Sequence, residues 1–240
     1  MSVSFCYDMH IMNSSLGTLQ STLLVKICGT TSVADAQLAE QAGADYLGII
    51  IEHEPSPRSV SLESAVAIAE AVRIPIVAVT VNLPRERLLE IHRVLRPAVL
   101  QLHGDESVET IRSLRSEGIV VWAVASGDAD QVRNRAAQFG PHGSDAILVD
   151  AHITTQHGTI YGGTGHVSDW QVARELVNSG YRVVLAGGLN AQNVAEVIAQ
   201  VRPWMVDVVS GVEAGKGIKD AEKVYNFIAA AKATIPDGLY

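Results

Sequence analysis

Two side chains capable of proton transfer stand directly after apolar runs of the chain. Cys28 follows the run in "VKICG" (residues 25–29), and Asp150 follows the run at 145–149. A thiol in such a place is either simple packing, since free cysteine is among the most buried residue types, or a reactive group. An aspartate whose pKa is raised by burial or by a nearby charge can serve as a general acid, whereas a capping or ion-paired aspartate is structural. The residues alone leave these alternatives open.

Three further side chains could hold a substrate. Arg58, in "EHEPSPRS" (52–59), offers a planar fork that fits a carboxylate or a phosphate, although a loop arginine is usually a solvated charge. Gln101 and His103, in "QLHGD", are two residues apart and therefore point to the same side of an extended chain. A histidine seen alone is more often structural than catalytic, so both are candidates for substrate binding and no more.

The elements that must position these residues alternate along the chain. From residue 22 onward, an apolar β-branched run is followed by a turn and an amphipathic segment, eight times over. The predicted strands are 23–27, 45–51, 75–81, 98–102, 119–124, 145–149, 182–186 and 205–209. The predicted helices are 32–42, 61–72, 84–94, 107–117, 129–138, 168–179, 190–200 and 219–232. Apolar strands joined by crossover helices form parallel sheets, and eight such units close into an α/β (β/α)₈ TIM barrel.

We therefore predict one barrel domain over residues 22–240, with an open doubly wound sheet as the alternative. The open sheet is disfavoured because the chain has eight units and "GGTG" (162–165) is not a dinucleotide fingerprint. In a barrel the chemistry lies at the carboxyl ends of the strands. The candidate residues stand at or near these ends.

Glycine-containing loops follow the last two predicted strands. Gly187 and Gly188 stand in "AGGLN", and Ser210 and Gly211 open "SGVEAGKG". In barrels these two loops commonly bind phosphate through backbone N–H groups and a helix N-terminus. The pattern predicts a phosphorylated small molecule as ligand, and ordinary turn glycines are the alternative.

A buried ion pair is expected inside the barrel. Lys26 has the same parity as Cys28, so both side chains can point inward. A buried lysine needs a partner, because an unpaired charge in a core is very costly. Asp207 lies on the last predicted strand, which is next to the first in a closed barrel. We predict that Lys26 and Asp207 pair.

Composition limits the classes of function. The 240 residues carry a formal net charge of −8, and no Lys/Arg cluster is interleaved with aromatic residues, so a nucleic-acid partner has little support. No apolar run approaches the ~20 residues that span a bilayer, and two distant cysteines fit a reducing cytoplasm.

His152, His157 and His166 lack metal-ligand spacing, so no metal is expected. We interpret residues 1–21 as a polar, flexible N-terminal extension.

The ordered motifs resemble those of phosphoribosylanthranilate isomerase, a (β/α)₈ enzyme family of tryptophan biosynthesis. The resemblance runs from about Leu24 to Ala231 and includes "KICG", "SPRSVS", "LQLHGDE", "YGGTGHVSDW", "AGGLNAQNV" and "VDVVSGVEAGKGIKD". It implies an Amadori rearrangement of N-(5-phosphoribosyl)anthranilate, an aminoaldose phosphate, into an aminoketose phosphate. Protons move within one molecule, so no cofactor is implied.

The resemblance also implies roles for the candidates. Cys28 would be the general base that takes the proton from C2′ of the ribose, and Asp150 the general acid that protonates the ring oxygen. Arg58 would bind the anthranilate carboxylate, and the two glycine-containing loops would hold the phosphate. Because a free cysteine titrates near ~8.5, the thiolate is expected to need a positive neighbour that lowers its pKa.

Some positions depart from the family's usual pattern near the active face, and several of the changes remove aromatic area. They are Glu52–Glu54, Thr80, His166, Ser168 and Val209. Two alternatives therefore stay open: a related aminoaldose-phosphate isomerase with an altered aryl pocket, and a catalytically silent phosphate-binding barrel. For the oligomeric state, a monomer and a homodimer are both expected possibilities.

Overall fold

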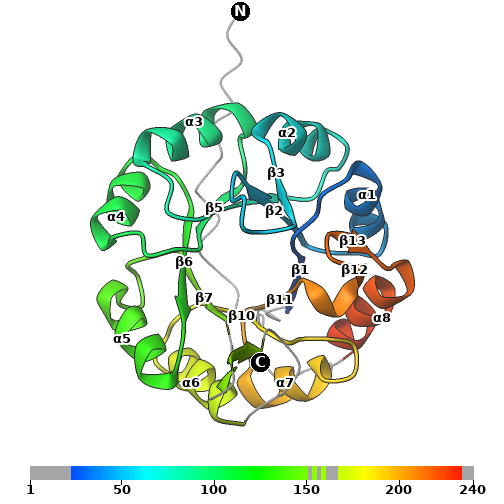
Figure 1. The fold of residues 1–240 in the computed structure, drawn as a ribbon. Helices are drawn as coiled ribbons and strands as arrows, with labels where there is room; N and C mark the ends of the chain where they lie inside the picture. The colour runs from blue at the N-terminus through cyan, green and yellow to red at the C-terminus, as the bar shows by residue number, and fades with distance from the viewer. Residues whose placement is uncertain (1–22, 151–152, 156–157, 161–166, 234–240) are drawn as a thin grey trace, which may run out of the picture.

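A closed ring of parallel strands surrounded by helices is visible in the computed structural model (Figure 1), which describes residues 23–150, 153–155, 158–160 and 167–233. The expected extension, residues 1–21, lies outside the described residues. The strands of the ring are β1 (Leu24–Ile27), β2 (Tyr46–Ile51), β4 (Ile76–Thr80), β5 (Val99–Leu102), β6 (Val121–Ser126), β7 (Ala146–Asp150), β10 (Val183–Ala186) and β11 (Met205–Val208). Because β1 pairs with both β11 and β2, the ring is closed and the predicted TIM barrel is confirmed.

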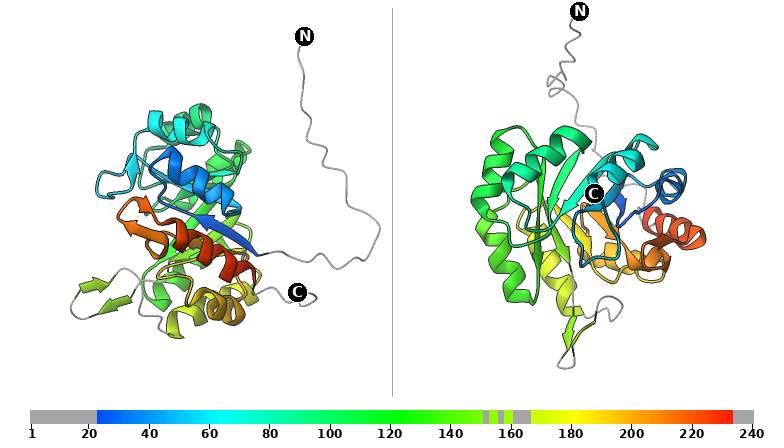
Figure 2. Two further views of the ribbon diagram at one scale, coloured as in Figure 1. Left: turned by 90° about the vertical axis from the view of Figure 1, so that its right-hand side faces the viewer. Right: turned by 45° about the horizontal axis from the view of Figure 1, so that its top comes forward.

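Helices follow the strands of the ring and cover its outside. They are α1 (Val33–Gln41), α2 (Leu62–Glu70), α3 (Arg85–Leu95), α4 (Val108–Ser116), α5 (Ala129–Phe139), α6 (Val167–Asn178), α7 (Val194–Val201) and α8 (Ala221–Lys232). Short elements complete the described fold: β3 (Ser59–Val60), β8 (Ile153–Thr155), β9 (Gly158–Ile160), η1 (Ser210–Val212), β12 (Glu213–Gly215) and β13 (Ile218–Lys219). The β8–β9 and β12–β13 hairpins stand at the end toward which the β1 arrow points (Figure 2).

One predicted helix begins well after its expected start, and one predicted strand is displaced along the chain. The helix expected at 190–200 begins only at Val194, because the Asn190 side chain accepts backbone hydrogen bonds from Gln192 and Asn193 and holds a turn there. The strand expected at 119–124 is β6, which starts and ends two residues later. Its first residue is fixed by a bond from its backbone N–H to Asp145 Oδ2 at 2.8 Å.

Alternation along the strands divides the core in two. Val25 and Ile27 of β1 face outward and belong to the large cluster between strands and helices. A second cluster fills the ring itself and includes Cys28, Trp122 and Met205. Trp122 contacts Trp204 edge-on with ring centroids 5.6 Å apart, so the barrel is a packed interior rather than a pore.

The predicted pair of Lys26 and Asp207 is confirmed inside the ring. The Lys26 ammonium is 0% exposed and donates to Asp207 Oδ2 at 2.8 Å and to Gln101 Oε1 at 3.0 Å. Burial is the largest single influence on the pKa of Lys26 and lowers it, but Asp207 and Cys28 together outweigh it and the net shift is upward. The lysine therefore stays charged within the barrel.

We expect Lys26→Met to destabilise the fold by about 3–5 kcal/mol, because it leaves the Asp207 carboxylate buried and unpaired. Urea unfolding followed by circular dichroism measures this loss. The double variant Lys26→Met/Asp207→Leu should recover a large part of it. As a control, Arg133→Met removes an exposed ion pair with Glu175 and should leave the urea midpoint unchanged. A single Lys26 variant as stable as the wild type would contradict the prediction.

Candidate active site

The predicted site residues gather where the ring strands end. Cys28 directly follows β1, His103 directly follows β5, and Asp150 is the last residue of β7. The loop after β10 holds Gly187 and Gly188. Since all strands of the ring run parallel, these residues share one mouth of the barrel.

Cys28 occupies a closely fitted place at this mouth. Its residue is 4% exposed, its N–H donates to Val208 O at 2.9 Å, and its carbonyl accepts a bond from Lys219 Nζ at 2.6 Å. A Cβ atom added at Gly48 on β2 would lie 2.5 Å from the Cys28 sulfur. The glycine of the neighbouring strand therefore provides the space that the thiol fills.

The expected lowering of the thiol pKa is wrong for the free protein. Burial is the largest influence and raises the pKa of Cys28, and the carboxylate of Asp207 adds to the increase. Lys26 and Lys219 act in the opposite direction through their positive charge, and Lys26 also through a hydrogen bond. The positive neighbours that a thiolate needs are present, but burial outweighs them.

Hydrogen-bonding side chains form a line across the mouth from β1 to β7. Lys26 donates to Gln101, and Gln101 Nε2 lies 3.0 Å from His103 Nδ1. The other ring nitrogen, Nε2, lies 3.8 Å from Asp150 Oδ2. Asp150 is 8% exposed, so its carboxyl group is buried yet reaches the mouth beside the imidazole. The strand-end acid and the strand-end thiol are thus linked through three intervening side chains.

Arg58 is held by a partner that sequence reasoning did not identify. Its Nε and Nη2 donate to the two carboxylate oxygens of Glu213, both at 2.7 Å. Burial raises the pKa of Glu213, but Arg58 and Lys219 together lower it more, so the carboxylate is charged. A Cβ at Gly29 would lie 2.8 Å from Arg58 Cδ, which places the arginine directly over the turn that follows the thiol.

The two glycine-containing loops contact each other through their backbones. A Cβ at Gly211 in η1 would lie 1.9 Å from the carbonyl oxygen of Leu189, so this contact tolerates only glycine. Gly187 and Gly188 both have positive φ, 89° and 64°. Ser210 opens the η1 turn next to Gly211. The structure brings these four residues of two loops to one place.

The chain matches the model of a known protein family over most of its length. The family model described as N-(5'phosphoribosyl)anthranilate (PRA) isomerase matches residues 25–230. The chain belongs to this family.

Individual relatives of the PRA isomerase family agree over almost their whole length. The enzyme of this name from Trichlorobacter lovleyi is 40% identical over 213 residues, covering 88% of this chain and 98% of the relative. The crystal structure of the enzyme from Thermotoga maritima has a TM-score of 0.78 at 34% identity and covers 88% and 99% of the two chains. A PRA isomerase in complex with reduced 1-(o-carboxyphenylamino)-1-deoxyribulose 5-phosphate has a TM-score of 0.75 at 32% identity, with the same coverage.

Two residues of this site, Glu213 and Lys219, were not predicted as site residues from the sequence. Glu213 stands in the quoted motif "SGVEAGKG", and Lys219 follows two residues after it, but neither had an assigned partner. Both are buried, at 7% and 6% exposure. A buried acid and a buried base so near each other in the sequence predict an ion pair, and Lys219 Nζ lies 3.4 Å from Glu213 Oε1.

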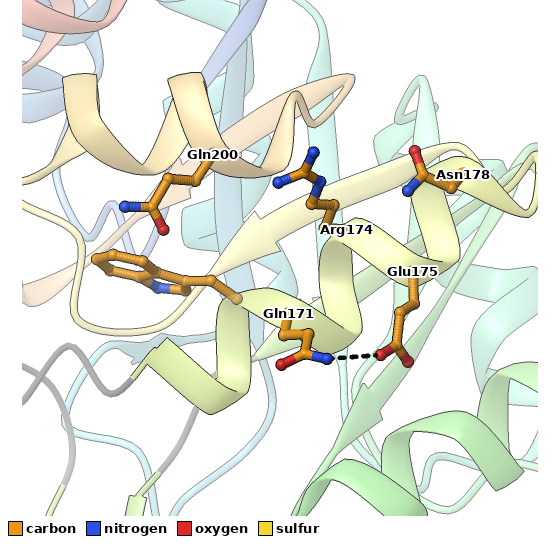
Figure 3. Close-up of a pocket in the computed structure, with 6 residues that line it drawn as sticks. Gln171, Arg174, Glu175, Asn178 and Gln200 are labelled. Carbon is orange, nitrogen blue, oxygen red and sulfur yellow. Dashed lines mark hydrogen bonds between the residues drawn. The ribbon is translucent and has the colours of Figure 1, made fainter.

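A surface hollow of about 420 Å³ lies apart from these residues, between α6 and α7 (Figure 3). It is lined by Trp170, Gln171, Arg174, Glu175, Asn178 and Gln200, none of which is a predicted site residue. Gln171 donates to Glu175 at 3.2 Å across one turn of α6. Gln200 likewise donates to Glu196 at 3.0 Å across one turn of α7.

The described part of the chain holds neither a metal-binding cluster nor a membrane-spanning helix. Within it, no group of three or more His, Cys, Asp or Glu side chains is arranged to hold a metal ion. His152, His157 and His166 lie outside the described residues. No described helix is long and apolar enough to cross a membrane.

We expect Cys28 to alkylate slowly with iodoacetamide at pH 8 and faster as the pH rises beyond about 9, because burial raises the pKa of the thiol. A Cys6→Ser variant isolates Cys28, and mass spectrometry follows the reaction. The matched control is Cys28→Ser, in which Cys6 reports the other thiol of the chain. A rate that reaches its plateau below pH 8 would show that Lys26 and Lys219 dominate over burial.

Proposed function

We propose that this PRA isomerase uses Cys28 as general base and Asp150 as general acid in its rearrangement of N-(5'-phosphoribosyl)anthranilate. The observation that carries the assignment is the placement of the two groups at one mouth of the barrel, at the ends of β1 and β7. No other thiol among the described residues is available for the first role. One group must accept a proton from carbon while another donates a proton to oxygen, so two separate sites are required.

The proposed sequence begins at the acid. Asp150 gives its proton to the furanose ring oxygen, the bond from that oxygen to C1′ breaks, and the anilino nitrogen lone pair forms a C=N bond. The Cys28 thiolate then removes the proton from C2′, and the resulting enol shifts to the 2-ketone as C1′ gains a proton. Atoms balance because the product is an isomer of the substrate, and no cofactor takes part in the proposal.

The base needs a charged environment, and the structure supplies the groups for it. Burial raises the pKa of Cys28, so the neutral thiol predominates in the free protein. Lys26 and Lys219 are the two cations that favour the thiolate. We propose that they stabilise the sulfur anion when the substrate displaces water from the mouth, since electrostatic interactions strengthen in a dry site.

Substrate binding is proposed for the remaining candidates. Arg58 donates to Glu213 through Nε and Nη2, and these two bonds fix the plane of the guanidinium group. Nη1 would then donate to the anthranilate carboxylate. The loops around Gly187–Gly188 and Ser210–Gly211 would hold the phosphate through backbone N–H groups. His103 borders the same mouth, where the ribose hydroxyls would lie, and Gln101, which is 1% exposed, supports it with its amide nitrogen 3.0 Å from Nδ1.

Location and assembly complete the proposal. A cytoplasmic biosynthetic enzyme acting on a phosphorylated small molecule fits two distant cysteines, with no nucleic acid or membrane as partner. The phosphoribosylanthranilate isomerase from Thermotoga maritima is dimeric. For this chain we propose a monomer or a homodimer, and sedimentation equilibrium distinguishes the two.

We expect Cys28→Ala and Asp150→Asn each to lower kcat by about 100-fold or more, because each removes one of the two proton-transfer groups. Turnover is measured as the change in anthranilate-ring fluorescence while the enzyme acts on freshly generated substrate. Cys6→Ser is the matched control and should behave like the wild type. A wild-type protein that binds a phosphorylated analogue without turnover would favour the silent barrel, and turnover only of another aminoaldose phosphate would favour the altered aryl pocket.

We expect Glu213→Gln to raise KM about tenfold while kcat changes little, because the neutral amide no longer fixes Arg58 by two charge-assisted bonds. Steady-state kinetics measure both constants. Arg58→Met should raise KM at least as much, and combining the two changes should add little further loss. Fully additive losses would contradict the proposed dependence of Arg58 on Glu213.

A further inference from the structure

The line of side chains from Lys26 to Asp150 has a fixed direction. The Lys26 ammonium carries only donors, so the group that Gln101 presents to it must be the amide oxygen, at 3.0 Å. The amide nitrogen of Gln101 then faces His103 Nδ1, also at 3.0 Å. An amide NH₂ can only donate, so Nδ1 of His103 must accept. The neutral imidazole therefore carries its proton on Nε2.

The protonated nitrogen is the one that faces the proposed acid. His103 Nε2 lies 3.8 Å from Asp150 Oδ2, close enough for a small side-chain movement to make a hydrogen bond. We propose that Lys26 and Gln101 are positioning residues that hold His103 in the Nε2–H tautomer, so that its N–H is ready to receive the carboxylate formed when Asp150 gives up its proton. This inference rests on the proposed role of Asp150 as acid.

The opposite tautomer would hinder the same step. With the proton on Nδ1, the Nε2 lone pair would face Asp150. A protonated Asp150 could then donate to the imidazole instead of to the ring oxygen, and the carboxylate left after transfer would face a second lone pair. A donor at this place stabilises the charge that develops during the reaction, as preorganised donors do in other active sites.

The first members of the line have little freedom to reorient. Lys26 is 0% exposed and Gln101 is 1% exposed, and Asp207 fixes the ammonium from the far side at 2.8 Å. Rotation of the Gln101 amide would place its NH₂ against the ammonium, donor against donor. The same ammonium also interacts with the Cys28 thiol. The buried Lys26 ammonium thus interacts with the proposed base directly. It influences the proposed acid through two intervening side chains, Gln101 and His103.

Nitrogen NMR tests the tautomer directly. In protein labelled with ¹⁵N-histidine, the His103 signals are identified by their absence from His103→Gln. We expect a protonated-type shift for Nε2 and an unprotonated-type shift for Nδ1 in the wild type. Observing the proton on Nδ1 would overturn the proposal, and this measurement needs no variant of Lys26 or Gln101.

Interrupting the line of side chains at Gln101 tests its effect on catalysis. Gln101→Met keeps the length of the side chain but cannot donate to Nδ1, so we expect mixed tautomers of His103 and a kcat lowered about 10- to 100-fold with little change in KM. Ser144→Ala removes another buried hydrogen bond, to Ala146 O on β7, and should change neither quantity. If Gln101→Met folds and keeps the wild-type kcat, the positioning role is excluded. The role of the acid is judged separately, by Asp150→Asn.

Discussion

The buried ammonium of Lys26 is the constraint on which the site depends. A full charge inside an apolar ring is tolerated only when it is paired and fully hydrogen-bonded. Asp207 on β11 supplies the opposite charge, and the parallel register sets Lys26 directly beside it. Gln101 on β5 supplies an acceptor from across the ring. Strands that are distant in the sequence are thereby joined by polar contacts as well as by packing, and the polar contacts lead to the mouth.

Burial is the main electrostatic obstacle to the proposed role of Cys28 as base. At Cys28 it opposes the charged form, so the thiolate depends on the neighbouring cations Lys26 and Lys219. The exclusion of water from the barrel mouth therefore hinders the proposed base. A fixed cation next to the sulfur is the simplest compensation, and the barrel places it two residues earlier on the same strand.

The sequence was sufficient for the barrel and for the inward-facing residues, because both follow from periodicity. Alternation on the first strand predicts that Lys26 lies inside with Cys28, and the closed ring predicts Asp207 as its partner. The sequence could not predict the hydrogen bond from Lys26 to Gln101. A contact across the ring depends on side-chain length and tilt, whereas the periodic pattern identifies only neighbouring strands. The ion pair between Glu213 and Arg58 could not be predicted for another reason. The two residues lie in different loops, and no periodic pattern relates one loop to another.

Two of the departures from the family pattern, Glu52 and Thr80, make no side-chain hydrogen bond to the line from Lys26 to Asp150. Glu52 adopts a left-handed backbone with φ of 54°, and its carboxylate pairs with Arg87 of α3, so its charge is neutralised outside the ring. Arg87 lowers the pKa of Glu52 accordingly. Thr80 is buried, and its hydroxyl finds no partner among the described residues. Because neither side chain bonds to Lys26, Gln101 or Asp207, substitutions at these two positions can accumulate while the buried line keeps its geometry.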